Sequence, residues 1–201
     1  MSKHPGTVTG DEQAFRQISS RFREEVGRLL AKIDFTTGPL PYWALIRMMF
    51  PVAESLGDLI YRKNDATAQN LRSVLETDFE AVRTGYAGRA AVLALLYRHS
   101  LTHHDELRTI RSGAREIGWF VNGADDGTHL SIHRTGNQFM IEFQPRAFYA
   151  DICGVCERAA GLSWGGEVML RYNGWMSLDL DVAIKKPNAR LRAARDEIAN
   201  F

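Results

Sequence analysis

The hydrophobic periodicity of this chain changes once, near residue 112, and that change fixes the fold class. Before it, apolar residues recur every three or four positions, which is the spacing of a helix with one buried stripe. After it, apolar and polar residues alternate, which is typical of a strand with one buried face. Because both patterns fall within 201 residues, a length that suits one domain, we predict a single α+β domain over residues 11–201.

The first part of the chain predicts four consecutive amphipathic helices joined by short loops, after a flexible arm at residues 1–10. Asp11 is a candidate N-cap for the first helix, and Pro51 should kink or restart the second. Short connections favour an antiparallel bundle, which we expect over residues 11–112. The predicted buried stripes contain Phe15, Ile18, Phe22, Val26, Leu29 and Ile33; Tyr42, Ile46, Met49, Ala53, Leu56 and Ile60; Leu71, Val74, Leu75, Phe79 and Val82; and Val92, Leu95, Leu96 and His99.

The second part, residues 113–201, predicts a small antiparallel sheet. Treating Gly136-Asn137 as a two-residue hairpin turn pairs Ile132 with Ile141 and Leu130 with Phe143. All four apolar side chains then lie on one face, so this register is self-consistent. A slip of one residue would invert both faces.

Other segments of the second part complete the expected architecture. A strand is predicted over 117–121, and Pro145 should open one further long helix. Residues 168–184 resemble a second hairpin with less regular alternation, and Pro187 should start a charged terminal helix. The inward positions of the long helix are Phe148, Ile152, Val155 and Ala159.

One short segment concentrates groups that transfer protons and bind phosphate. The sequence from Tyr97 to His104 reads Tyr-Arg-His-Ser-Leu-Thr-His-His and closes the fourth helix. Arg98 followed by His103 and His104 resembles the Arg-x(4–6)-His motif of HEPN-type helical domains, and the resemblance extends over the motif and the N-terminal bundle. By that resemblance the protein would be a metal-independent ribonuclease or RNA-binding factor. His103 or His104 would deprotonate a ribose 2′-hydroxyl, and Arg98 would stabilise charge on the phosphorane.

The spacing of the motif favours a homodimer. Five residues on a straight helix turn about 500°, so Arg98 and His103 would lie about 140° apart. A two-fold axis near residues 95–108 would instead bring Arg98 of one chain toward His103 of the other. We therefore expect a homodimer with composite sites. A bundle that serves only dimerisation or partner docking, without catalysis, is the alternative function.

A metal site competes with this interpretation. His99 and His103 stand four residues apart on the helix and could chelate zinc, but no third ligand is evident. His129 and His133, which should face away from the apolar side of the hairpin, cannot chelate together because four strand residues span about 13 Å. We expect no bound metal and no cofactor, since the chain has no phosphate-binding loop, nucleophile elbow or dinucleotide motif.

Basic residues follow the motif and could extend a phosphate-binding surface. Arg108, Arg111 and Arg115 are spaced for one face of a helix, and Arg108 and Arg111 are the predicted RNA contacts. Because the net charge is only +1, RNA binding would have to come from such a local patch. Cys153 and Cys156 lie in the middle of the predicted long helix, so we expect buried, unliganded thiols.

The chain carries no sign of export or of a membrane span. Its polar start lacks the apolar run of a signal peptide, and no apolar stretch approaches the ~20 residues that cross a bilayer. Two cysteines in 201 residues argue against a secreted disulfide scaffold. We therefore expect a cytoplasmic protein without a membrane partner.

Overall fold

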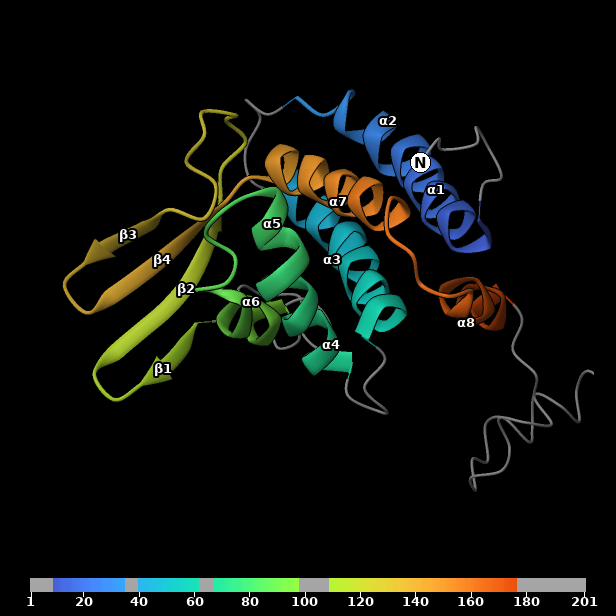
Figure 1. Cartoon of the computed structure of the whole chain (residues 1–201). Coiled ribbons are helices and arrows are strands. Elements are labelled where there is room, and N and C mark those ends of the chain that lie inside the picture. The colour runs from blue at the N-terminus through green and yellow to red at the C-terminus, as the bar shows by residue number, and fades with distance from the viewer. Residues whose placement is uncertain (1–8, 35–39, 62–66, 98–108, 177–201) are drawn as a thin grey trace, which may run out of the picture.

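The computed structural model describes residues 9–34, 40–61, 67–97 and 109–176, and it confirms the α+β class (Figure 1). The elements in chain order are α1 (Gly10–Phe22), the π-helical turn η1 (Arg23–Gly27), α2 (Arg28–Leu30), α3 (Leu40–Tyr61), α4 (Thr67–Val74), the π-helical turn η2 (Leu75–Phe79), α5 (Glu80–Val82), α6 (Ala90–Leu96), β1 (Ile110–Ser112), β2 (Arg115–Val121), β3 (Ile132–Thr135), β4 (Gln138–Phe143), α7 (Pro145–Ala160) and α8 (Glu167–Met176).

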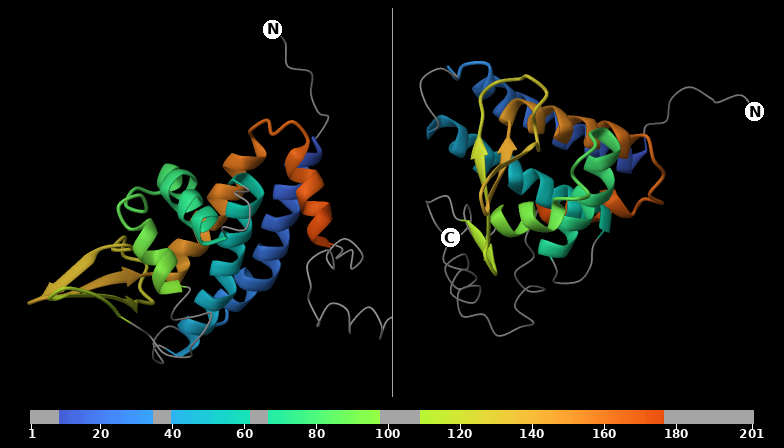
Figure 2. Two further views of the ribbon diagram at one scale, coloured as in Figure 1. Left: turned by 90° about the horizontal axis from the view of Figure 1, so that it is seen from below. Right: turned by 90° about the vertical axis from the view of Figure 1, so that its left-hand side faces the viewer.

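The helices surround α3, which runs through the middle of the molecule (Figures 1 and 2). It packs against α4 on one side and α7 on another, while α1 packs against α7 and α8. The helix continues through Pro51 without a restart. The predicted stripes on the first four helical stretches are largely buried. A helix from the second half of the chain, α7, thus completes the bundle that the first half begins. Among the described helices, none is both long and apolar enough to cross a membrane.

An aromatic cluster centred on Phe50 of α3 joins the bundle to the sheet. The Phe50 ring lies 4.9 Å from Phe148 of α7, 5.6 Å from Phe143 of β4 and 5.6 Å from Trp119 of β2. All four side chains are fully buried or nearly so. Aromatic rings bury a large apolar area, so this cluster stabilises the orientation of the sheet on the helices.

The sheet is mixed, not wholly antiparallel as predicted. Its strand order is β1-β2-β4-β3, with antiparallel β1–β2 and β3–β4 pairs and a parallel β2–β4 pair in the middle. The segment 122–131 links the end of β2 to the start of β3 at the same end of the sheet. Strand β3 then runs back, so β4, after the hairpin turn, has the same direction as β2. The sheet projects from one end of the bundle as a wing with a free tip (Figure 2).

The β3–β4 hairpin forms in the predicted register. Ile132 pairs with Ile141, and both Leu130 and Phe143 are buried. One detail of the prediction is wrong: His129 does not face away but is buried. Leu130 has a φ of 70°, and this left-handed residue interrupts the alternation just before β3.

The hairpin predicted at 168–184 is wrong over the residues that the structure describes, because Glu167–Met176 form α8. The N-terminus of α8 is held by Asp11 of α1, whose carboxylate accepts hydrogen bonds from Gly166 N at 2.7 Å and Met169 N at 2.8 Å. Asp11 is therefore not the cap of α1. That role belongs to Thr9, whose side chain accepts from Glu12 N. The predicted helix after Pro187 lies outside the described residues.

Candidate functional site

The predicted catalytic residues lie outside the described part of the chain. Arg98, His103 and His104 fall in the segment 98–108, as do Arg108 and the alternative zinc ligand His99. The structure does describe the residues on either side of this segment, Tyr97 and Thr109.

The residue directly before this segment lies at the end of α6 and is buried in the core. Tyr97, the residue before Arg98, is 6% exposed, and its ring stacks on Phe50 at 4.7 Å and 11° between planes. The chain returns at Thr109, whose hydroxyl donates to the carboxylate of Glu116 on β2. The residues on either side of the motif segment are thus held by the core and by the sheet.

Arg111 and Arg115 do not share a helical face as predicted, because they lie on strands. Gly113, with a φ of +59°, forms the turn between β1 and β2, so the chain reverses between the two arginines. Arg111 pairs with Glu116 in the ladder, and its guanidinium lies 3.6 Å from that carboxylate. Since side chains alternate along a strand, Arg111 and Arg115 face opposite sides of the sheet.

Three side chains form an arginine–aromatic cluster near the tip of the sheet: Arg115 on β2, Phe139 on β4 and Arg134 on β3. The guanidinium carbons of Arg115 and Arg134 lie 5.9 and 5.3 Å from the centre of the Phe139 ring. The Arg134 Nε donates to Gly136 O at 3.1 Å. Within the described ranges, neither arginine contacts a carboxylate.

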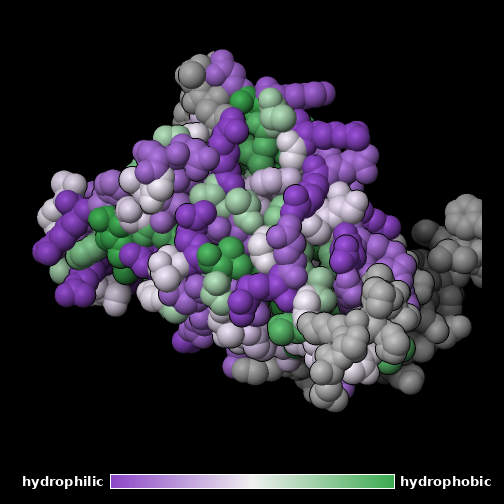
Figure 3. Space-filling model, turned by 45° about the horizontal axis from the view of Figure 1, so that its top comes forward, coloured by the Kyte–Doolittle hydropathy of each residue, from purple (hydrophilic) through white to green (hydrophobic). Residues whose placement is uncertain are grey.

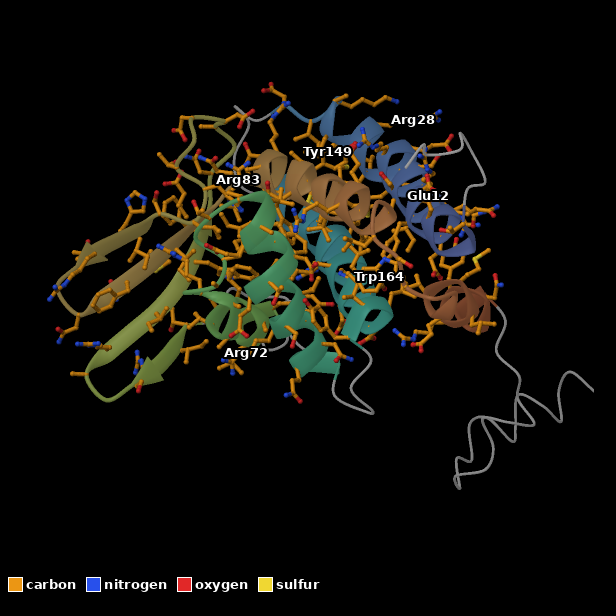
Figure 4. All side chains as sticks on the ribbon, in the orientation of Figure 1. Glu12, Arg28, Arg72, Arg83, Tyr149 and Trp164 are labelled. Carbon is orange, nitrogen blue, oxygen red and sulfur yellow. The ribbon has the colours of Figure 1, made fainter. Side chains whose placement is uncertain are left out.

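A second polar cluster, the junction network, lies where the sheet meets the bundle. Arg83 Nε donates to both carboxylate oxygens of Asp151 on α7, at 3.0 and 2.8 Å. The Tyr86 hydroxyl donates to Asp151 Oδ2 at 2.8 Å, and its oxygen lies 2.9 Å from His129 Nε2. Figure 4 labels Arg83, which reaches toward α7 from the segment after α5. The network consists of Arg83, Tyr86, His129 and Asp151.

The hydrogen bonds of the junction network fix the tautomer of His129. Gln144 N donates to Nδ1 at 2.9 Å, so Nδ1 is the acceptor and the proton of the neutral ring is on Nε2. The Nε2–H group donates a hydrogen bond to Tyr86 Oη, and the Tyr86 hydroxyl donates one to Asp151 Oδ2. Burial, reinforced by the positive charge of Arg83, lowers the pKa of His129 to about 3. The His129 side chain is 0% exposed, so it stabilises the junction and cannot reach a substrate.

Glu142 organises a third cluster on the other side of β4. This buried carboxylate accepts from Asn122 Nδ2 at 2.6 Å, from Gln144 Nε2 at 3.0 Å and from the hydroxyl of Thr128. Its Oε2 lies 2.7 Å from Nε2 of the half-exposed His133. Burial acts to raise the pKa of Glu142, but these hydrogen bonds outweigh burial and lower the pKa below its usual value. The carboxylate thus stays charged and orients His133 at the surface.

The two thiols are buried and free, as predicted. Burial raises the pKa of Cys153, and it raises the pKa of Cys156 to about 12. Thiols in that state are poor nucleophiles and poor metal ligands. Within the described ranges, no three histidine, cysteine, aspartate or glutamate side chains are grouped to hold a metal ion.

A shallow groove of about 570 Å³ runs between α1 and α7. Two arginines line it, but Arg16 is paired with Glu12, and Arg23 is paired with Glu157. Its charges are therefore already neutralised within the protein, so the groove offers no evident anion site.

Sequence reasoning did not find the junction network or the Glu142 cluster. Tyr86 and His129 are 43 residues apart, and Tyr86 and Asp151 are 65 apart. No local spacing signals such a contact. The arginine–aromatic cluster was also missed, since Arg115 was assigned to a helix. The chain matches no protein-family model, no curated protein and no solved structure.

Proposed function

We propose that this protein is a HEPN-like, metal-independent ribonuclease of the cytoplasm in which Arg98, His103 and His104 act on RNA. The observation that carries the proposal is the fixed end of α6, where buried Tyr97 stacks on Phe50 directly before Arg98. A catalytic motif needs such a rigid origin, because small displacements of acid–base groups reduce the rate strongly. His103 or His104 removes the 2′-hydroxyl proton, and the 2′-oxygen attacks phosphorus. The 5′-oxygen leaves and takes up a proton from water, while Arg98 stabilises the negative charge on the phosphorane oxygens.

The two histidines that the structure describes make contacts within the fold. His129 is buried and held neutral, and His133 is paired with Glu142. Of these two, His129 cannot reach a polymeric substrate, and His133 has no arginine of the motif beside it in sequence, which favours His103 and His104 as the proposed bases. The sheet that follows the motif also exposes arginines, which supply the local positive charge that RNA binding requires.

The proposal includes a homodimer with composite sites. Leu95 on α6, three residues before Arg98, is 42% exposed, although most of the other apolar side chains on this helix are buried. An apolar residue in that position suits an isologous contact along α6. Such a contact would bring the motif of one chain toward the motif of its partner, as the predicted divergence of Arg98 and His103 requires. The proposed substrate of these composite sites is RNA.

Single-turnover cleavage of a labelled RNA in EDTA tests the activity. Substituting His103→Ala and His104→Ala together should reduce the rate roughly 100-fold or more, because a general base contributes that much. His133→Ala is the matched control, since it removes a half-exposed histidine outside the motif, and it should leave the rate unchanged. Undiminished cleavage by the double variant, or no cleavage by the wild type, would favour the non-catalytic interaction domain instead.

The dimer has a separate test. Sedimentation at micromolar concentration should give the mass of two chains, and Ser100→Cys should form a crosslink between subunits. A monomer, or a dimer whose cysteines at this position never crosslink, would exclude the composite site.

A further inference from the structure

We propose that the arginine–aromatic cluster (Arg115, Phe139 and Arg134) is a binding surface for single-stranded RNA. This inference rests on the proposed function, in that it takes RNA as the ligand, but it assigns binding to residues outside the motif. The cluster lies near the tip of the sheet, which projects away from the helices (Figure 2).

The first support is a difference in how arginines are paired. Four exposed arginines on the helical part are matched by glutamates of the same chain. The two guanidinium groups at the sheet tip have no such partner within the described ranges, and both point toward one aromatic ring. Their charge therefore remains available to an anionic ligand. The helical pairs are Arg16–Glu12, Arg23–Glu157, Arg28–Glu24 and Arg72–Glu76.

The second support is the apolar surface between these charges. Phe139 is only half-buried, and Ile132, which lies on the same face of the neighbouring strand, is 51% exposed. Figure 3 shows hydrophobic atoms on the wing bordered by hydrophilic ones. Nucleobases stack on aromatic rings and on guanidinium planes, whereas phosphates bind arginine. This combination fits a single strand, because the bases of a duplex are already stacked on one another.

The spacing of the cluster suits an extended ligand. Arg115 and Arg134 lie on either side of β4, so their backbones are separated by two inter-strand steps of about 4.8 Å and by an offset of two residues along the strands. Arg134 pairs directly with Phe139 in the ladder. One strand of RNA crossing β4 would thus contact both arginines and the ring between them.

The test is fluorescence anisotropy with a labelled 12-nucleotide single-stranded RNA of mixed sequence. The full chain carries His103→Ala and His104→Ala in every sample, so that the probe is not cleaved. Adding Arg115→Ala and Arg134→Ala should weaken binding roughly 10-fold or more at 0.1 M salt. It should also make the slope of log K against log salt shallower by about 1.4, at roughly 0.7 per phosphate contact.

Two further variants make the result specific. Arg28→Ala with Arg72→Ala removes the same charge from two exposed helical arginines, and it should change affinity less than 2-fold. Phe139→Leu keeps an apolar residue of similar size but removes the ring, and it should weaken binding roughly 5-fold by loss of base stacking. Circular dichroism should show the same secondary structure in all variants.

The outcomes separate this inference from the ribonuclease proposal. Equal affinity of the sheet-tip and helix variants, or equal affinity for a duplex of the same sequence, would overturn the RNA surface even if the wild type cleaves RNA. Conversely, binding that depends on Arg115 and Arg134 supports the surface even where the wild type shows no cleavage. Absence of any RNA binding overturns the surface as well.

Discussion

Arg83, directly after α5, and Arg134, on β3, carry the same charge, yet their surroundings differ in almost every other respect. At the junction with the bundle, Arg83 donates to a carboxylate that is 3% exposed, and Tyr86 and His129 continue the chain of hydrogen bonds. At the tip, Arg134 faces an aromatic ring and solvent. Arg83 is held in the fold by its bond to a buried carboxylate, whereas the exposed Arg134 belongs to the surface that we propose for RNA. One arginine thus stabilises the junction, and we propose that the other binds a ligand.

The largest loss of stability is expected from removing Asp151, the acceptor that Arg83 and Tyr86 share in the junction network. Asp151→Ala leaves the guanidinium of Arg83 and the hydroxyl of Tyr86 without their partner. Because Asp151 is buried but Arg83 is 35% exposed, the free energy of unfolding should fall by about 2–4 kcal/mol, less than for a fully buried pair. Glu157→Ala is a matched control on the same helix, because its pair with Arg23 is exposed and should contribute about 0–1 kcal/mol. Urea unfolding measures both, and equal losses would contradict a special role for the junction.

A smaller change removes one hydroxyl from the same network. Tyr86→Phe keeps the buried ring but removes the hydroxyl that contacts His129 Nε2 and that donates to Asp151, whose pair with Arg83 remains. The free energy of unfolding should fall by about 1–3 kcal/mol. Tyr61→Phe is the control, since Tyr61 donates to Asp78 at a site that is only partly buried. A loss that is no larger than this control's would show that the network is not cooperative.

Acid should weaken the junction through His129. The folded-state pKa of about 3 lies below the ordinary value of 6.5, so between these values the unfolded chain binds a proton that the folded chain does not. This contribution is complete above pH 6.5 and decreases as pH falls toward 3, by at most about 1.4 kcal/mol per pH unit. Because carboxylates also lose stability in acid, the measurement is the difference between wild type and His129→Asn in urea unfolding at pH 7, 6, 5 and 4. The variant should show the shallower slope, while His133→Asn serves as a control for loss of a histidine.

The smallest effect is expected at the tip. Arg115→Ala with Arg134→Ala removes only exposed contacts with the Phe139 ring, so the free energy of unfolding should change by about 1 kcal/mol or less. Thermal or urea unfolding checks this. A large loss would mean that the tip arginines are structural, and the distinction between the two regions would fail.

Sequence reasoning located the elements whose signals are local. The Gly136-Asn137 turn and the alternation around it predicted the pairing of Ile132 with Ile141, and the stripe after Pro145 predicted α7 with Cys153 and Cys156 buried. In each case a few neighbouring residues carry the whole signal, either a turn that requires positive φ or apolar positions on one helix face.

Local signals failed where distant segments decide the structure. Residues 168–176 have the alternation of a strand but form α8, because Asp11, more than 150 residues earlier, caps the helix. The parallel pairing of β2 with β4 depends on the path of 122–131, which places β3 on the far side of β4 from β2. Arg115 has helical spacing from Arg111 but lies beyond a turn. Of the site, sequence supplied the motif around Arg98, whereas the junction network needs a tertiary structure to be seen.

The bond between Asp11 and the start of α8 has a consequence for the order in which the protein is made. On the ribosome, α1 emerges early, but the backbone groups that its buried carboxylate binds belong to Gly166 and Met169. Both α7 and α8, the helices against which α1 packs, are also synthesised late. The first helix of the described chain must therefore wait for nearly all of the rest before it can dock. Until then its apolar stripe is exposed, and transiently exposed apolar surface of this kind promotes aggregation of a nascent chain.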